Sequence, residues 1–183
     1  CIIVPYEMYR RYGDARILSE NYEMMKKWYV FLEERAKKRP VNPVKRFKRN
    51  PYRRYTIETG VDYGEWCEPD VESTSAMRTP QGKVATAFFA YSGRMLAEIA
   101  AILGKEDDAA YYSKTAEMAK KAWRFIATED GKISSDRQAD YVRALAFGLL
   151  DGDEARQAAA DLNELVKKCG YHLNTGFLST PNL

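Results

Sequence analysis

Hydrophobic residues recur at helical spacing through the second half of the chain. From Lys83 to Leu103, large apolar side chains return every three or four residues, and alanines fill most of the remaining positions. A helix that is apolar or small on nearly every side is an inner helix, covered all round. The next stretch, Glu106 to Ala127, has one apolar and one charged face, which predicts an outer, amphipathic helix. The alternation then repeats, with a mostly apolar helix over Gln138–Leu150 and a charged one over Glu154–Lys168.

Two further helices are predicted near the N-terminus. Pro5 suits the first turn of a short helix over Tyr6–Arg11, and Gly13 suits its end. Ser19 is the predicted N-cap of a long amphipathic helix that ends before Pro40. Beyond that point the helical period is lost for about forty residues.

Residues 39–80 predict one long loop. Five of the seven prolines of the chain lie there, and no hydrophobic period persists. Loops of this length are uncommon in compact domains and are usually functional or mobile when they occur. The stretch 35–54 also carries ten basic residues and no acidic one, although the whole chain has a net charge of only +3. The rest of the chain then carries 19 basic and 26 acidic residues, so this is a mildly acidic domain with a basic loop.

The alternation of inner and outer helices predicts the architecture, because it is typical of stacked αα-hairpins. We predict an all-α fold with residues 1–183 in a single helical domain. It is built either as an α-solenoid or as part of an α/α toroid whose inner helices line a central funnel. The long connections, over 39–80, 128–137 and 170–183, each lead from an outer helix to an inner one. In a toroid these connections meet at one end and form a pocket there.

Composition narrows the class of protein. With 45% hydrophobic and 13% aromatic residues, the chain is globular. Three widely spaced cysteines and a single histidine argue against a zinc site and against a disulfide framework, so we expect reduced thiols, a cytoplasmic location and no cofactor. No apolar run approaches 18 residues, which argues against a membrane helix. The sequence begins at Cys1, inside an apolar pattern and without Met, so we expect a piece of a longer protein.

The segment from Asp62 to Pro69 carries the most informative chemistry. It holds three carboxylates and two aromatic rings in a stretch that favours neither helix nor strand. Carboxylates accept hydrogen bonds from sugar hydroxyls, and a Trp ring packs against the C–H face of a pyranose. The segment therefore predicts a sugar-binding loop. The alternative is a solvated acidic turn with Trp66 folded back into the core.

Five motifs, in their order and spacing, resemble the catalytic domain of bacterial α-L-rhamnosidases, inverting glycoside hydrolases with an (α/α)6 barrel. The motifs are Ile-Val-Pro-Tyr-Glu-Met-Tyr at 3–9, Tyr-Gly-Glu-Trp at 63–66, Thr-Ala-Phe-Phe-Ala-Tyr-Ser at 86–92, Ser-Asp-Arg-Gln at 135–138 and His-Leu-Asn-Thr-Gly-Phe-Leu-Ser-Thr-Pro at 172–181. Two positions depart from the pattern of the family. Glu65 stands where the family usually has Asp, and Ser179 stands where it usually has Gly.

The resemblance implies an inverting hydrolase of terminal α-L-rhamnosyl residues that acts on a rhamnose-containing glycan or glycoside. Inversion needs two carboxyl groups about 6.5–9.5 Å apart. The general acid and base of the family fall before and after this chain, so no catalytic residue maps onto it. We therefore expect the chain alone to be inactive, and its exposed helix faces to promote self-association.

The predicted substrate-binding residues are Asp62, Tyr63, Glu65, Trp66, Glu68, Gln138 and His172. For Asp62, Tyr63 and Glu68, the alternative is that they only order the loop. Gln138 is either a hydroxyl ligand at the funnel mouth or a surface residue, and a lone histidine such as His172 is more often structural than functional. Two neighbouring residues are given structural roles: Asp136 is the predicted N-cap of the helix that follows it, and Phe177 is assigned to the core.

Two rival functions remain. One is another six-hairpin glycosidase with a different sugar. The other is a non-catalytic helical module that binds a polyanion through residues 35–54, where aromatic residues alternate with basic ones. No RNA- or DNA-binding motif surrounds that stretch, which argues against nucleic acid. Salt-sensitive retention on nucleic acid would favour the polyanion, because phosphate contacts weaken steeply with salt.

Overall fold

A computed structural model of the chain describes residues 1–38, 50–60, 62–69 and 81–183. Its helices are α1 (Ile3–Tyr12), α2 (Arg16–Lys37), α4 (Gly82–Ile102), α5 (Glu106–Ala127), α6 (Gln138–Ala146) and α7 (Gly152–Lys168), with short 3-10 turns η1 (Arg53–Tyr55) and η2 (Thr180–Asn182). Two strands of two residues each, β1 (Thr128–Glu129) and β2 (Lys132–Ile133), pair antiparallel. The predicted all-α fold is confirmed.

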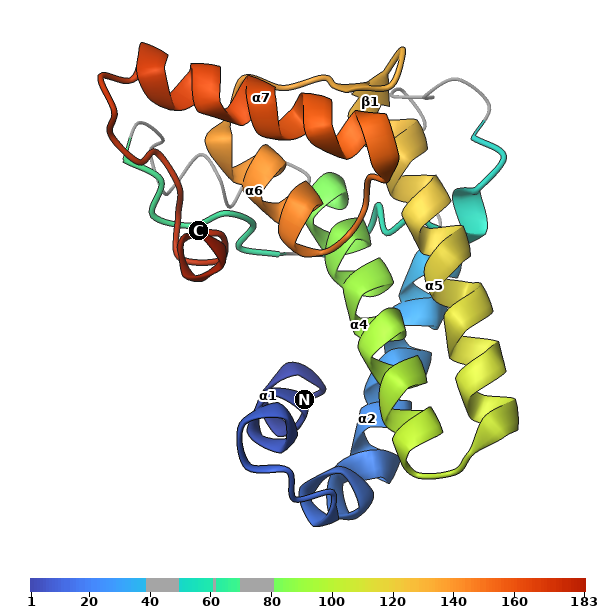
Figure 1. The fold of residues 1–183 in the computed structure, drawn as a ribbon. Helices are drawn as coiled ribbons and strands as arrows, with labels where there is room; N and C mark the ends of the chain where they lie inside the picture. The colour runs from blue at the N-terminus through green and yellow to red at the C-terminus, as the bar shows by residue number, and fades with distance from the viewer. Residues whose placement is uncertain (39–49, 61, 70–80) are drawn as a thin grey trace.

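The helices form hairpins around α4, as Figure 1 shows. α5 runs back along α4, α2 lies behind the two and contacts both, and α1 lies near the foot of α4. α6 and α7 form a second hairpin at the opposite end of α4. The described parts of the three long connections all lie at that upper end, where α4 and α6 begin, whereas the short α4–α5 turn lies at the lower end.

Burial separates inner from outer helices in the predicted way. In α4, 11 of 21 residues are buried, and in α6, 7 of 9 are buried. In α5 only 7 of 22 are buried, and in α7 only Ala158 is buried among 17. For α4 the difference follows from the sequence, because its side chains are apolar or small on nearly every side, while α5 and α7 carry charges on one face. In α6 the buried residues also include Gln138, Asp140 and Arg143, which are polar or charged.

Close packing between α2 and α4 depends on a glycine. The ring of Tyr29 on α2 lies against Phe89 of α4, with centroids 5.2 Å apart, and edge-on to Tyr112 of α5 at 5.3 Å. Gly93 faces the Tyr29 hydroxyl, and a Cβ atom there would overlap it. The hydroxyl itself is buried and finds no hydrogen-bond partner among the described residues. The core therefore depends on shape at this point and not on polar contacts.

α6 ends four residues before the predicted Leu150. Gly148 adopts a left-handed conformation, with φ of 64°. This conformation allows the Leu149 N–H to donate to the Ala144 carbonyl at 2.9 Å and the Gly148 N–H to donate to the Leu145 carbonyl at 3.1 Å. Such a pair of bonds is the Schellman motif, which closes a helix. The apolar residues at 149 and 150 are still buried, but they lie beyond the helix end.

Two predicted N-caps are wrong. α2 begins at Arg16, and Ser19 lies inside it with its hydroxyl donating to the Arg16 carbonyl at 2.9 Å. The carboxylate of Asp14 accepts the Arg16 N–H at 2.9 Å, which starts the helix earlier.

The second wrong N-cap is that of α6, although this helix begins at Gln138 as predicted. Its N-cap residue is Arg137 and not Asp136, which is exposed. The hydroxyl of Ser135 accepts the Arg137 N–H at 3.2 Å. This bond closes a local turn just before the first helical residue, and no side chain caps the helix itself.

Candidate functional site

Glu65 is the buried centre of the predicted sugar-binding loop. Its residue exposure is 1%, and that of Arg143 on α6 is 2%. The Arg143 Nη1 donates to Glu65 Oε2 at 2.5 Å. The backbone N–H of Ser179 donates to Oε1 at 2.8 Å, and the Ser179 hydroxyl donates to Oε2 at 2.8 Å. Both carboxylate oxygens therefore already accept hydrogen bonds from the protein, and Glu65 joins the loop to α6 and to the C-terminal segment.

The other two loop carboxylates also bind arginines. Asp62 accepts from Arg35 of α2, with Nη1 to Oδ1 at 2.9 Å and a second, shorter bond from Nη2, while the Arg35 Nε donates to the Thr59 carbonyl at 2.6 Å. Glu68 is 5% exposed and accepts from Arg137, with Nε to Oε1 at 3.2 Å and a shorter bond from Nη2 to Oε2. Burial lowers the pKa of the Arg137 guanidinium, but its hydrogen bonds to Glu68 and the charge of that carboxylate raise it more, so the net pKa lies above the ordinary value.

The three carboxylates are thus spaced three residues apart, and each binds an arginine from a different position in the fold. Charge-assisted bonds of this kind are stronger than neutral ones. These bonds attach the loop to the rest of the fold. They favour the alternative prediction for Asp62 and Glu68, that these residues only order the loop. A direct contact between these carboxylates and a sugar stays a prediction.

The aromatic side chains of the loop face the opposite way. Trp66 is 38% exposed and stacks on Tyr63, which is 54% exposed, with ring centroids 5.3 Å apart and planes 23° apart. Phe177 of the C-terminal segment stands edge-on to Trp66, with centroids 6.3 Å apart and planes 81° apart. Phe177 is 52% exposed, so its assignment to the core is wrong, and Trp66 is not folded back into the core either. We call Tyr63, Trp66 and Phe177 the aromatic platform.

Two glycines allow the platform to assemble. Gly64 has φ of 62°, a left-handed conformation that favours glycine, and a Cβ atom there would overlap the Gln81 side chain. Gly176 lies so close to the Trp66 carbonyl that a Cβ atom would overlap it. The N–H of Phe177, the next residue, donates to that carbonyl at 3.0 Å. The loop and the C-terminal segment are therefore bonded backbone to backbone beneath the rings.

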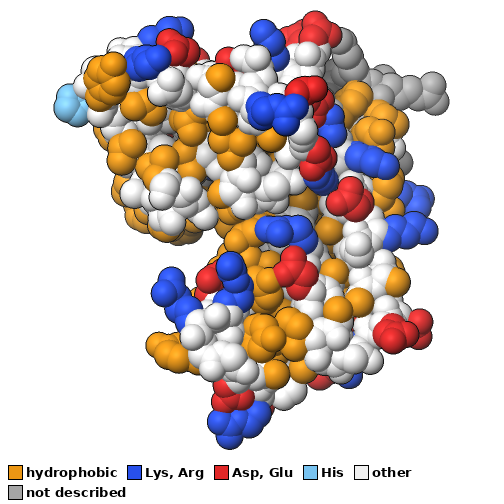
Figure 2. All heavy atoms as spheres, in the orientation of Figure 1, with side chains coloured by type: hydrophobic (Ala, Val, Ile, Leu, Met, Phe, Trp, Pro, Cys, Tyr) orange, Lys and Arg blue, Asp and Glu red, His pale blue; other side chains and the backbone are white. Residues whose placement is uncertain are grey.

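Gln138 and His172 lie at the same end of the molecule, but the side chain of Gln138 is buried and that of His172 is exposed. Gln138 is 2% exposed, and its amide bonds the backbone of the C-terminal segment on both sides, donating to the His172 carbonyl at 3.1 Å and accepting the Asn174 N–H at 2.9 Å. The His172 imidazole is exposed at the edge of the molecule in Figure 2. Glu65, Trp66, Gln138 and His172 thus lie at one end of the helical array, while their contact with sugar stays a prediction.

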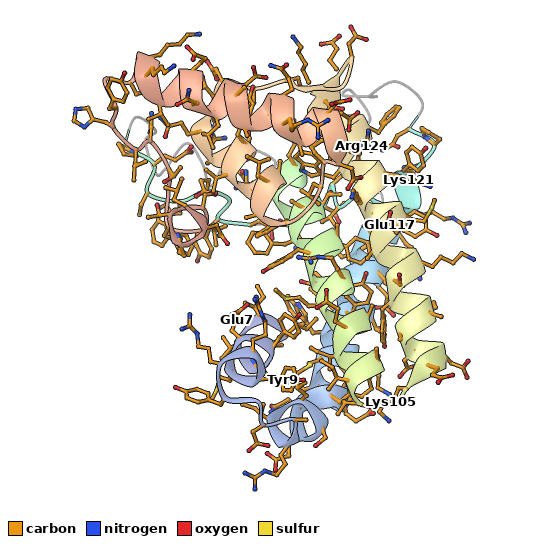
Figure 3. The ribbon with its side chains drawn as sticks, in the orientation of Figure 1. Glu7, Tyr9, Lys105, Glu117, Lys121 and Arg124 are labelled. Carbon is orange, nitrogen blue, oxygen red and sulfur yellow. The ribbon has the colours of Figure 1, made fainter. Side chains whose placement is uncertain are left out.

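A depression lies away from these residues. It has a volume of about 740 Å³ and is bounded by Tyr52, the end of α5 and the β1–β2 turn. Lys121 and Arg124, labelled in Figure 3, project from α5 beside it. None of the predicted substrate-binding residues lines this depression.

Other sequence predictions meet the structure only in part. Arg35 of the basic stretch binds Asp62 of the loop, Arg53 and Arg54 are exposed, and residues 39–49 lie outside the described residues.

All three cysteines are free and exposed. In the part of the chain that the structure describes, no His, Cys, Asp and Glu side chains gather in a group of three that could hold a metal. No helix among the described residues is long and apolar enough to cross a membrane.

Apolar side chains are also exposed along one face of each of the first two helices. They are Val4, Met8 and Tyr12 on α1, and Met24, Trp28 and Phe31 on α2. Trp28 is 41% exposed and stacks on Phe31, with centroids 5.3 Å apart. Self-association through such faces stays a prediction.

Known proteins match the chain over its whole length. Residues 1–183 match the model of the bacterial alpha-L-rhamnosidase 6 hairpin glycosidase domain. An alpha-L-rhamnosidase of Formosa agariphila is 32% identical, over 100% of this chain and 18% of its own length.

Solved structures agree with the sequence matches. The crystal structure of a Streptomyces avermitilis alpha-L-rhamnosidase complexed with L-rhamnose superposes with a TM-score of 0.78 at 30% identity, covering 100% of this chain and 15% of that one. The alpha-L-rhamnosidase from Dictyoglumus thermophilum gives a TM-score of 0.74 at 26% identity, covering 98% of this chain and 19% of that one. The chain thus spans less than a fifth of the length of these relatives. It belongs to the bacterial alpha-L-rhamnosidase six-hairpin glycosidase domain family.

Proposed function

We propose that this chain supplies a sugar-binding wall to the catalytic domain of an α-L-rhamnosidase. In the full-length protein, that domain hydrolyses terminal α-L-rhamnosyl residues of a glycan or glycoside with inversion. The observation that carries the proposal is the aromatic platform, because Tyr63, Trp66 and Phe177 are exposed although their backbones are fixed. One relative was solved in complex with L-rhamnose, which supports the choice of sugar.

The chemistry of rhamnose suits such a platform. Rhamnose is a 6-deoxy sugar, so it carries a methyl group in addition to the C–H faces of its ring. Aromatic faces bind such apolar surfaces, and the hydroxyl of Tyr63 adds a polar group at the edge. The platform thereby fixes one side of the sugar and excludes water from it.

The loop carboxylates do not supply the acid and base of the reaction in this proposal. An inverting hydrolase needs one carboxyl group near the leaving oxygen and another near the attacking water. Both oxygens of Glu65 already bind Arg143 and Ser179, and Glu68 binds Arg137 through both of its oxygens. The acid and base therefore come from other segments of the full-length protein, and the isolated chain is expected to show no turnover.

The test is the hydrolysis of p-nitrophenyl α-L-rhamnoside by the full-length protein. We expect turnover of this substrate and none of the matching aryl α-mannoside or β-glucoside. Replacing Trp66 by Ala should raise KM about tenfold, since about 1.4 kcal/mol of binding energy corresponds to a tenfold change. Trp28→Ala is the matched control, because Trp28 is equally exposed and equally stacked but lies on α2, away from the platform. An unchanged KM in Trp66→Ala, or preference for another glycoside, would contradict the proposal.

A further inference from the structure

Arg143 joins three separate segments of the chain. Its Nη1 donates to Glu65 Oε2 at 2.5 Å and to the Ser179 hydroxyl at 3.2 Å, and its Nη2 donates to Asp140 Oδ1 at 2.5 Å. Asp140 lies one turn earlier on α6 and also accepts the Ser135 hydroxyl at 2.7 Å. A residue of α6 thus connects the loop 62–69 with the C-terminal segment.

The chemistry of the contacts requires a guanidinium. Its N–H groups point in fixed directions in one plane. Nη1 can therefore donate to Glu65 and Ser179 while Nη2 donates to Asp140. A lysine ammonium is a point charge on a flexible stem and does not reproduce this geometry. At 2% exposure, Arg143 also has no water to replace a lost partner.

The partners of Arg143 lie next to the platform in the sequence. Glu65 directly precedes Trp66, and Ser179 follows Phe177 by two residues. The two halves of the platform are bonded at the backbone, through the Phe177 N–H and the Trp66 carbonyl at 3.0 Å. Because so few residues separate them, a change in the position of Glu65 moves Trp66, and a change in the position of Ser179 moves Phe177.

We propose that Arg143 is a positioning residue for sugar binding, which acts through Trp66 and Phe177 by fixing the loop against the C-terminal segment. The inference rests on the proposed function, because it assumes that the platform binds the sugar. Arg143 itself is buried beneath the platform and does not touch the substrate.

The experiment compares Arg143→Lys and Trp66→Ala, alone and combined, in the full-length protein with p-nitrophenyl α-L-rhamnoside. Arg143→Lys should raise KM about tenfold and change kcat less than about twofold, because the platform contributes to substrate binding and not to the chemical step. In the Trp66→Ala background, Arg143→Lys should add less than about twofold, since two changes that act through one contact are not additive. Arg124→Lys is the matched control: Arg124 binds Glu154 at 2.5 Å between α5 and α7, apart from η2 in Figure 3, and should leave KM unchanged.

The outcomes separate this inference from the function on which it rests. If Trp66→Ala does not change KM, the platform does not bind the sugar, and both ideas fail. If Trp66→Ala raises KM but Arg143→Lys does not, or if the two effects multiply in the double variant, only the role of Arg143 is overturned. Ser179→Ala is the second variant if Arg143→Lys does not fold. It removes a hydroxyl without leaving a buried charge unpaired, and it should raise KM in the wild-type background but not in Trp66→Ala.

Discussion

The α4–α5 hairpin and the loop 62–69 are both well fixed, but by opposite kinds of contact. The hairpin is fixed by apolar and small side chains, such as Phe89 and Ala119, and Gly93 lets the Tyr29 hydroxyl of α2 approach α4 closely. The loop is fixed by three ion pairs, of which the Glu65–Arg143 pair is almost completely buried. Shape holds one region, and charge holds the other.

The comparison shows where each kind of contact is useful. Apolar packing turns a helix face toward the core, but it is non-directional and does not fix the position of a single loop residue. The ion pairs of the loop fix the backbone from below, so that Tyr63 and Trp66 are free to face outward. These ion pairs have a cost, because the free energy needed to take two charges out of water can exceed the gain from their attraction. We infer that the ion pairs of the loop fix its conformation more than they stabilise the fold.

The largest expected effect comes from removing the charge at the centre of the loop contacts. Arg143→Met leaves Glu65 and Asp140 buried without a cation, which should cost about 3–5 kcal/mol. Hydrogen–deuterium exchange should show the loss as faster exchange in peptides that cover 62–69 and 175–183, while peptides of the α4–α5 hairpin change little.

Arg124→Met provides the control for that loss. Its pair with Glu154 is about one-third exposed on both sides, so its removal should cost less than about 1 kcal/mol. Equal effects of the two substitutions would show that burial does not distinguish the loop from the outer surface.

The sequence predicts the hairpin region far better than the loop. The apolar period reveals α4 and α5 nearly to the residue, because every helical turn repeats the same signal. It fails at the end of α6, where Gly148 closes the helix while apolar residues continue. Local hydrogen bonding by Asp14 and Ser135 likewise overrides the expected N-caps.

For the candidate site, the sequence identifies the loop but not the roles within it. The motif 63–66 carries the aromatic rings that the structure exposes. The partner of Glu65 lies 78 residues away, and nothing in the pattern of α6 indicates that Arg143 pairs with the loop. Pairings at such separation depend on the tertiary fold. A signal was present in principle, since an arginine inside a mostly buried helix requires a partner.

The hairpin region has its own sharp test. In Gly93→Ala, the added Cβ atom overlaps the Tyr29 hydroxyl and lies 3.0 Å from the Cβ of Ala116, so overpacking should cost about 1–3 kcal/mol. Tyr29→Phe removes a buried hydroxyl that has no partner among the described residues, so alone it should be neutral or stabilise by up to about 1 kcal/mol. Together they should recover part of the loss in the α4 peptides by hydrogen–deuterium exchange. No recovery would mean that the ring and not the hydroxyl sets the fit.

The smallest expected effect is a coupling between the two positions that depart from the family pattern. Glu65 and Ser179 meet in the structure, through two bonds of 2.8 Å. In Glu65→Asp the carboxylate withdraws by about 1.5 Å, the length of one carbon–carbon bond, and it loses reach to Arg143 or to Ser179. In Ser179→Gly the hydroxyl is lost, although the N–H remains.

The double variant decides whether the two departures form one unit. If Glu65→Asp draws the carboxylate away from Ser179, the hydroxyl keeps only the Ala139 carbonyl, at 3.2 Å, as an acceptor, so Ser179→Gly should then cost less than it does beside Glu65. The difference should be about 1 kcal/mol in the free energy of local opening, measured by hydrogen exchange of 62–69. Thr180→Gly is the control for added backbone freedom, because the Thr180 hydroxyl bonds the Gly176 carbonyl and not Glu65. Additive losses in the Glu65–Ser179 pair would show that the glutamate reaches Arg143 without help from the serine, and that the two substitutions are independent.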